Sequence, residues 1–226
     1  MIDAGRCLTA LEATWPPAGV RHAGPWRLRD GAGGGKRVSS AVADGPVAPE
    51  DVAAAGGLVM LRPQDAAVAR MLDAAGWRTV DPTVLMAGDA ARIAAPDEAV
   101  YDADAPLAAQ TDLWAAGGIG PARLAVMDRV TGPKSYLLGR DGDRVAAAGF
   151  VACDGGIAML HALEVAPEAR RRGLGARMTR AAAHWATGQG ATILALAVTE
   201  ANAPARSLYA ALGLVEVGRY AYRQAP

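Results

Sequence analysis

The sequence predicts an α/β (α+β) fold with two domains in tandem, each a mixed, mostly antiparallel sheet flanked by helices, of which the C-terminal copy is complete. Two observations lead to this prediction. Residues 156–222 follow the order strand, loop, helix, strand, helix, strand. Residues 58–87 show the order strand, helix, strand nearer the N-terminus. The chain has 226 residues, of which 52% are hydrophobic, so it can bury a sizeable core.

The N-terminal half is predicted to contain a helix, a hairpin and a strand, helix, strand unit. The helix covers residues 2–15, and the hairpin covers residues 26–43. Within the hairpin, the glycine-rich segment 31–36 separates two strand-like pieces, 26–29 and 37–41, so a turn is expected there.

A segment rich in proline and acidic residues, 94–106, is expected to link the two domains. After it, residues 107–130 are predicted to form helices. Residues 135–152 are predicted to form a pair of strands around Asp141, Gly142 and Asp143, a composition typical of a tight turn.

The remaining elements form the core of the C-terminal half. Residues 156–165 are apolar enough for a buried strand, and residues 174–187 carry apolar side chains at helical spacing. Residues 191–199 read as a further strand. Asn202 is expected to open a second helix and Gly213 to end it, before a last strand over 214–222.

The loop over residues 169–176, Ala-Arg-Arg-Arg-Gly-Leu-Gly-Ala, lies between the first strand of that core and its first helix. Gly173 and Gly175 let the main chain approach a ligand closely, and the first N–H groups of a helix have no partners within the helix. The loop is therefore a candidate anion site, suited to a phosphate. It lacks the third glycine of a nicotinamide-binding fingerprint, and the chain has no Walker A motif.

These residues resemble the core of the GCN5-related N-acetyltransferases (GNAT superfamily). Besides the loop, the resemblance rests on the pattern Asn-x-x-Ala-x-x-Leu-Tyr-x-x-x-Gly over residues 202–213. In that family the loop wraps the diphosphate of acetyl-coenzyme A (acetyl-CoA), and the preceding strand pairs with the pantetheine arm of that molecule. The resemblance implies these binding residues: Leu163, Glu164, Val165, Arg170, Arg171, Arg172, Gly173, Leu174, Gly175, Ala176, Asn202, Ala205 and Tyr209.

The resemblance also suggests which residues move protons. Tyr209 stands where the family usually keeps a tyrosine that donates a proton to the departing thiolate. His161 and Glu164 are both candidates for the base. Their spacing of three places them on opposite faces of a regular strand unless a bulge intervenes. His161 is favoured because an imidazole titrates near neutrality, and because His161 to Val165 resembles a segment of the arylalkylamine acetyltransferases.

An internal repeat suggests how the chain is divided. Residues 65–77 align on residues 202–214 without a gap; Gly76 then matches Gly213, and Leu72 takes the position of Tyr209. No comparable glycine-rich loop precedes Leu72. We therefore predict a degenerate N-terminal domain over residues 1–95 and a catalytic domain over residues 96–226. Any strand, helix, strand unit with a glycine stop would show the same pattern, which leaves duplication as one of two explanations.

Composition limits the function classes. Lys+Arg and Asp+Glu are 23 each, so the chain lacks the basic footprint of a nucleic-acid-binding protein. No apolar run approaches about 18 residues and the first residues do not resemble a signal peptide, so no membrane partner and a cytoplasmic location are expected. Three scattered histidines and two cysteines give no metal-ligand spacing.

The predicted function is an N-acetyltransferase that moves acetyl from acetyl-CoA directly to a primary amine. The alternative is a regulatory module of the same fold that binds CoA or acyl-CoA without turnover. The acceptor, a small amine, an amino-acid-like molecule or a peptide, is left open. Residues 113–127, with Trp114, Gly117, Gly118 and Gly120, are expected to form a mobile, partly apolar wall of its site. A monomer and a homodimer both fit the sequence.

Overall fold

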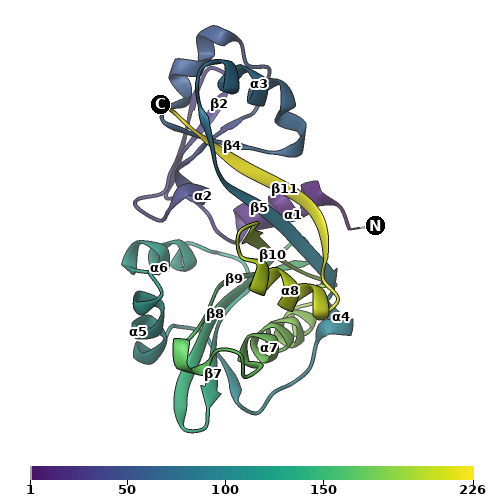
Figure 1. Ribbon diagram of the computed structural model, residues 1–226. Helices are drawn as coiled ribbons and strands as arrows, with labels where there is room; N and C mark the ends of the chain where they lie inside the picture. Colours follow the sequence, from purple (N-terminus) through teal and green to yellow (C-terminus); the bar gives the residue numbers. More distant parts are fainter. Residues whose placement is uncertain (1) are drawn as a thin grey trace.

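The computed structural model describes residues 2–226 and shows an elongated molecule with two lobes (Figure 1). The helices are α1 (Ala4–Ala13), α2 (Lys36–Ser39), α3 (Ala66–Ala74), α4 (Ala90–Ile93), α5 (Ala108–Ala116), α6 (Pro121–Asp128), α7 (Leu174–Gly188) and α8 (Ala203–Ala211), with short 3-10 turns η1 (Pro49–Ala55), η2 (Pro63–Asp65) and η3 (Pro167–Ala169). The strands are β1 (Gly19–Ala23), β2 (Trp26–Asp30), β3 (Ala41–Ala43), β4 (Leu58–Leu61), β5 (Arg78–Asp89), β6 (Val100–Ala103), β7 (Lys134–Asp141), β8 (Arg144–Asp154), β9 (Ile157–Val165), β10 (Ile193–Thr199) and β11 (Val215–Gln224).

All of these strands belong to one sheet, in the order β1-β2-β3-β4-β11-β5-β10-β9-β8-β7-β6. The expectation of a separate sheet in each half is therefore wrong. β5 comes from the N-terminal half but pairs with β10 and β11, and β11 comes from the C-terminal half but pairs with β4. Figure 1 shows β5 and β11 running side by side from one lobe into the other. Each of these two long strands is hydrogen-bonded to strands of the other half. The sheet is therefore continuous, with no pair of free edges between the two halves.

Going outward from the β5–β11 pair, the strands follow the same sequence of parallel and antiparallel pairings in both directions. On one side β4 and β3 run parallel and β2 follows antiparallel; on the other side β10 and β9 run parallel and β8 follows antiparallel. Helices α3 and α8 also end alike. Trp77 N donates to Leu72 O at 3.0 Å and Leu214 N donates to Tyr209 O at 3.1 Å, in each case across a glycine of positive φ.

The structure differs from the sequence prediction in the first lobe and in the linker. Residues 36–39 form the short helix α2 rather than the second strand of a hairpin, and only Ala41–Ala43 pairs with β2. Gly35, with φ of 99°, turns the chain into this helix. β1 and β2 form a hairpin that the sequence did not indicate, and the linker contains β6, which pairs with β7 and forms the edge of the sheet.

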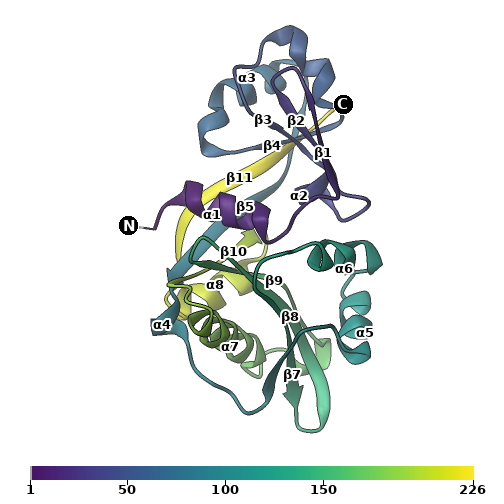
Figure 2. The same cartoon turned by 180° about the vertical axis from the view of Figure 1, so that it is seen from behind.

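Helices cover both faces of the sheet. α1 packs across the centre of one face, on β5, β10 and β11, as the two opposite views agree (Figures 1 and 2). α5 and α6 cover the same face farther along, over β8. α7 lies on the opposite face, where Met178 and Ala182 are fully buried against the sheet. The central strands are thus covered on both sides, which fixes the position of the site described next.

No helix within residues 2–226 is both long and apolar enough to cross a membrane.

Candidate active site

The site is a cleft where β9 and β10 separate. The two strands pair in parallel only as far as Leu160 and Leu196. Beyond that point the residues that follow on each strand line opposite sides of a cavity of about 870 Å³. Both strands keep their outer partners, β8 and β5. Their facing main-chain groups are therefore available to an amide-rich ligand that enters between them.

The glycine-rich loop closes one end of this cleft. Arg171 and Gly173 have φ values of 64° and 81°, and α7 begins directly after Gly173. Within the described chain, the five amide N–H groups of residues 171–175 donate to no protein acceptor. Five successive amides without partners at the start of a helix of 15 residues form a cradle suited to a phosphate group.

Twelve of the thirteen predicted binding residues line the cleft: Leu163, Glu164, Val165, Arg170, Arg171, Gly173, Leu174, Gly175, Ala176, Asn202, Ala205 and Tyr209. Arg172 does not. Its side chain is 63% exposed and pairs with Asp141 of β7 at 2.7 Å. Asn202 caps α8 by accepting a hydrogen bond from Ala205 N at 3.1 Å, which orients the helix that carries Tyr209.

A bulge in β9 brings the two candidate bases to the same face of the sheet. His161 pairs with Phe150 and Glu164 with Ala148, so two residues of β9 stand opposite Gly149 alone. Ala162 has φ of 49°, and its carbonyl oxygen accepts a hydrogen bond of 2.8 Å from Nε1 of Trp114. The spacing of three therefore does not separate His161 from Glu164.

The buried imidazole of His161 has both ring nitrogens engaged. Thr14 Oγ1 donates to Ala10 O at 2.6 Å, so it accepts from Nε2 of His161 at 2.8 Å. The guanidinium of Arg37 can only donate, and its Nη1 lies 3.3 Å from Nδ1 of His161. These partners assign the neutral tautomer with the proton on Nε2.

Burial, and then the positive charge of Arg37, lower the pKa of His161 well below its ordinary value. The imidazole is therefore neutral near pH 7 and, contrary to the expectation from the sequence, does not titrate near neutrality. The sequence could not show that His161 is buried, because the residues that cover it are distant in sequence. Trp15, just after α1, is one of them, and its ring centroid lies 5.0 Å from that of His161.

Glu164 is held at the mouth of the cleft. Its carboxylate pairs with Arg170 at 3.0 Å, and its side chain is partly exposed. Gly117 lies against it, because a Cβ at residue 117 would stand 2.8 Å from the carboxylate carbon. Glu164 thus reaches both the cleft and the segment that follows α5.

Tyr209 lines the cleft from α8 and is 8% exposed. Burial raises the pKa of its phenol to about 12. No group of residues 2–226 forms a hydrogen bond with its hydroxyl. At neutral pH the phenol is protonated, so it can donate to a partner in the cleft.

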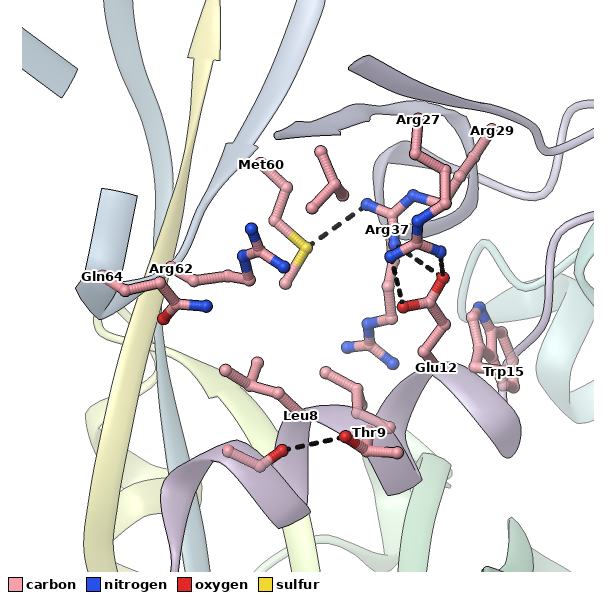
Figure 3. Close-up of a pocket in the computed structure, with 13 residues that line it drawn as sticks. Leu8, Thr9, Glu12, Trp15, Arg27, Arg29, Arg37, Met60, Arg62 and Gln64 are labelled. Carbon is pink, nitrogen blue, oxygen red and sulfur yellow. Dashed lines mark hydrogen bonds and ion pairs between the residues drawn. The ribbon is translucent and has the colours of Figure 1, made fainter. Parts of the chain in front are cut away.

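Two further cavities adjoin the cleft on the α1 side of the sheet. The first has a volume of about 380 Å³, and its lining includes Trp15, Arg37, His161 and Tyr220. The second, of about 340 Å³, lies under α1, and its lining includes Glu12, Arg27, Arg29, Arg37 and Arg62. Figure 3 shows these arginines and Glu12 around the second cavity.

This contribution of the N-terminal half was not expected from the sequence. One signal was available: Trp26, Arg27, Leu28 and Arg29 alternate, which places both arginines on one face of a strand. The expected wall over 113–127 also differs. Trp114 is fully buried and holds the β9 bulge, while Ile119 and Arg123 are the residues of that segment that line the cavity of about 380 Å³.

Neither of the two cysteines lines the cleft or the two smaller cavities. Cys7 and Cys153 are both buried free thiols, and burial raises the pKa of Cys153 to about 11. Among the described residues, no three side chains of His, Cys, Asp or Glu lie close enough together to hold a metal ion.

The fold and the cleft resemble those of acetyltransferases of the GNAT type. Residues 104–214 match the model of the acetyltransferase (GNAT) family. Over 65 residues the chain is 38% identical to aminoglycoside N(6')-acetyltransferase type 1 of Klebsiella aerogenes, which is 29% of this chain and 43% of that enzyme. The chain therefore spans less than half the length of this curated relative.

Solved structures share the fold over nearly the whole chain. A GCN5-related N-acetyltransferase from Kribbella flavida has a TM-score of 0.71 at 21% identity, over 99% of this chain and 95% of that one. A tandem GNAT protein from the clavulanic acid biosynthesis pathway has a TM-score of 0.57 at 16% identity, over 93% and 84%. These structures show that the chain shares the GNAT fold.

Proposed function

We propose that this protein transfers acetyl from acetyl-CoA directly to a primary amine, with no covalent enzyme intermediate. The observation that carries the proposal is the cleft between β9 and β10, which ends at five amides without acceptors. The amides suit the diphosphate, and the free strand edges suit the two amide groups of the pantetheine arm.

The chemistry needs a neutral amine, an acceptor for its proton and a donor for the leaving sulfur. The amine nitrogen attacks the thioester carbon, the new N–C bond forms, and the C–S bond breaks. Tyr209 gives its phenolic proton to the departing thiolate, since its raised pKa keeps it protonated until that step. No group on the enzyme is acylated.

We assign the first uptake of the amine proton to Glu164. His161 lies on the same face, but its Nδ1 faces the Arg37 guanidinium at 3.3 Å and its pKa is lowered by burial. The carboxylate of Glu164 reaches the cleft and is partly exposed to solvent, which lets the proton leave. In this proposal His161 has a structural role: its contacts with Thr14 and Arg37 hold these side chains in place on the acceptor side of the cleft.

For the N-terminal half we propose an origin by duplication and a role in shaping the acceptor site. The mirrored pairing around β5 and β11 and the matching ends of α3 and α8 support this proposal. In the first copy, η1 and a loop stand where the second copy has α7 and its amide cradle. The proposed boundary near residue 95 follows β5 and α4, so a strand of the first copy completes the sheet of the second.

Thiol release from acetyl-CoA, measured against a panel of primary amines, tests the proposal. We expect release that depends on the amine and is lost in Gly173→Glu, whose side chain would enter the cradle. Binding of CoA by calorimetry without release for any amine would favour the alternative, a regulatory module that binds CoA. Absence of CoA binding would contradict both the acetyltransferase proposal and the regulatory-module alternative.

A further inference from the structure

Three cavities meet at a single side chain, that of Arg37. The acetyl-CoA cleft, the cavity beside Trp15 and His161, and the cavity under α1 are all lined by Arg37, which comes from the short helix α2. Its guanidinium therefore lies between the two cavities on the α1 side of the sheet and the cleft.

The charges around these cavities are mainly positive. The two cavities on the α1 side are lined by six basic side chains, Arg27, Arg29, Lys36, Arg37, Arg62 and Arg123, and by two acidic ones, Glu12 and Asp81. Most of the basic groups already have partners. Arg27 pairs with Glu12 and Asp44, Arg62 with Asp65 and Lys36 with Asp81; Arg29 lies 4.0 Å from Glu12 and donates to Ser40.

Arg37 differs from these residues because it has no carboxylate partner within residues 2–226. Its guanidinium lies 3.3 Å from Nδ1 of His161 and near the phenols of Tyr220 and Tyr222, and its Nε is buried without a hydrogen-bond acceptor. A buried guanidinium donor without an acceptor is costly, and an oxyanion with two oxygens is the partner that satisfies it best.

We propose that Arg37 binds an anionic oxygen group of the acceptor, a carboxylate or a phosphate, and that the substrate is thus an amine carrying such a group a few bonds from its nitrogen. The short distance follows from the position of Arg37 beside His161, which lines the acetyl-CoA cleft. This inference rests on the proposed acetyl transfer and names the class of acceptor for it.

The same arrangement disfavours a polyamine acceptor. An aminoglycoside carries several ammonium groups, which the excess of arginine and lysine side chains around both cavities would repel. We therefore separate the acceptor of this protein from that named for the Klebsiella aerogenes relative, with which it shares 65 aligned residues.

The experiment compares amines in matched pairs that differ only in the anionic group. β-Alanine is compared with β-alaninamide, glycine with glycinamide, and O-phosphoethanolamine with ethanolamine, each by kcat/KM in the thiol-release assay at saturating acetyl-CoA. A charge-assisted hydrogen bond to Arg37 should favour the anionic member of at least one pair by about tenfold or more. The pair that shows the preference distinguishes carboxylate from phosphate.

Variants of Arg37 then assign the preference to this residue. In Arg37→Gln the ratio should fall to about one, and in Arg37→Lys part of it should remain because the charge is kept. Arg223→Gln is the matched control, since Arg223 is also a mostly buried arginine on the sheet but pairs with Asp73 outside these cavities. It should keep the wild-type ratio.

Equal kcat/KM values within every pair in the wild-type protein, or a preference that persists in Arg37→Gln, would overturn the inference and leave the acetyltransferase proposal standing. If no amine is acetylated, that proposal fails separately. Calorimetry with N-acetyl-β-alanine and its amide, in wild type and Arg37→Lys, still tests Arg37 in that case. Equal or absent binding of both compounds would contradict the inference.

Discussion

Nη1 of Arg37 lies 3.3 Å from Nδ1 of His161, so a residue of the N-terminal half contributes to the charge state of an imidazole on β9. Together with burial, this contact holds the pKa of His161 well below its ordinary value. The two halves of the chain are thus coupled electrostatically at the proposed acceptor site, in addition to sharing a sheet.

This coupling predicts how stability depends on pH. In the unfolded chain His161 would titrate near the ordinary pKa of about 6.5, whereas in the folded protein it stays neutral. The unfolded state therefore binds more protons below about pH 6.5, so stability from this residue is complete above that pH and is lost as the pH falls.

We expect the free energy of unfolding of wild type to fall, relative to His161→Gln, by up to about 1.4 kcal/mol per pH unit below about pH 6. Arg37→Gln should reduce this slope, because it removes the second cause of the lowered pKa. Urea unfolding at several pH values measures both effects. Parallel curves for wild type and His161→Gln would contradict the assignment.

Substitution in the amide cradle should weaken CoA binding. Gly173 has φ of 81°, where a side chain is strained by about 1–2 kcal/mol. In Gly173→Ala we therefore expect the Kd for CoA, measured by calorimetry, to rise about tenfold. Gly188→Ala is the control: Gly188 lies at the other end of α7 and has open space around it, so its Kd should equal that of wild type.

Removal of the Tyr209 hydroxyl should slow the reaction without weakening donor binding. In Tyr209→Phe the ring still packs beneath the cleft, but the thiolate loses its proton donor. We expect kcat to fall by about 100-fold, with little change in the Kd for CoA. Tyr101→Phe, on the exposed strand β6, should keep the wild-type kcat. A wild-type kcat in Tyr209→Phe would show that another group protonates the sulfur.

The shared sheet should make unfolding a single event. β5 lies between β10 and β11, so neither half can lose its strand without exposing the other. We expect urea transitions followed by fluorescence of Trp26 and Trp77 in one lobe, and of Trp114 and Trp185 in the other, to coincide in variants that keep only one pair. A chain of residues 96–226 alone, without β5, should not give a cooperative transition. Two separated transitions, or a stable 96–226 fragment, would show that the halves fold independently.

Much of the second half could be predicted from local sequence. The strands and helices from residue 134 onward follow from apolar periodicity and from glycine stops, and the anion loop follows from Gly173 and Gly175. These signals are short in range, because the groups that cause them lie within one turn or one strand of each other.

The exchange of β5 and β11 could not be predicted, because it is decided by pairing between residues more than a hundred positions apart. A bulge between His161 and Glu164 was left open by the sequence, but its place at Ala162 could not be predicted, since alanine seldom adopts φ of 49° and is held there by Trp114. Arg37 was expected on a strand. Its place beside His161 depends on α2, which begins directly after a glycine-rich turn that lies against α6.

The position of β11 also bears on the order of events during synthesis. β11 is translated after every other strand, yet it stands between β4 and β5, which are translated early. Until β11 has left the ribosome, β4 and β5 each lack a neighbour, and the nascent first lobe presents unpaired strand edges. We therefore expect the growing chain to depend on chaperones for most of its translation, and the sheet to close only in its final step.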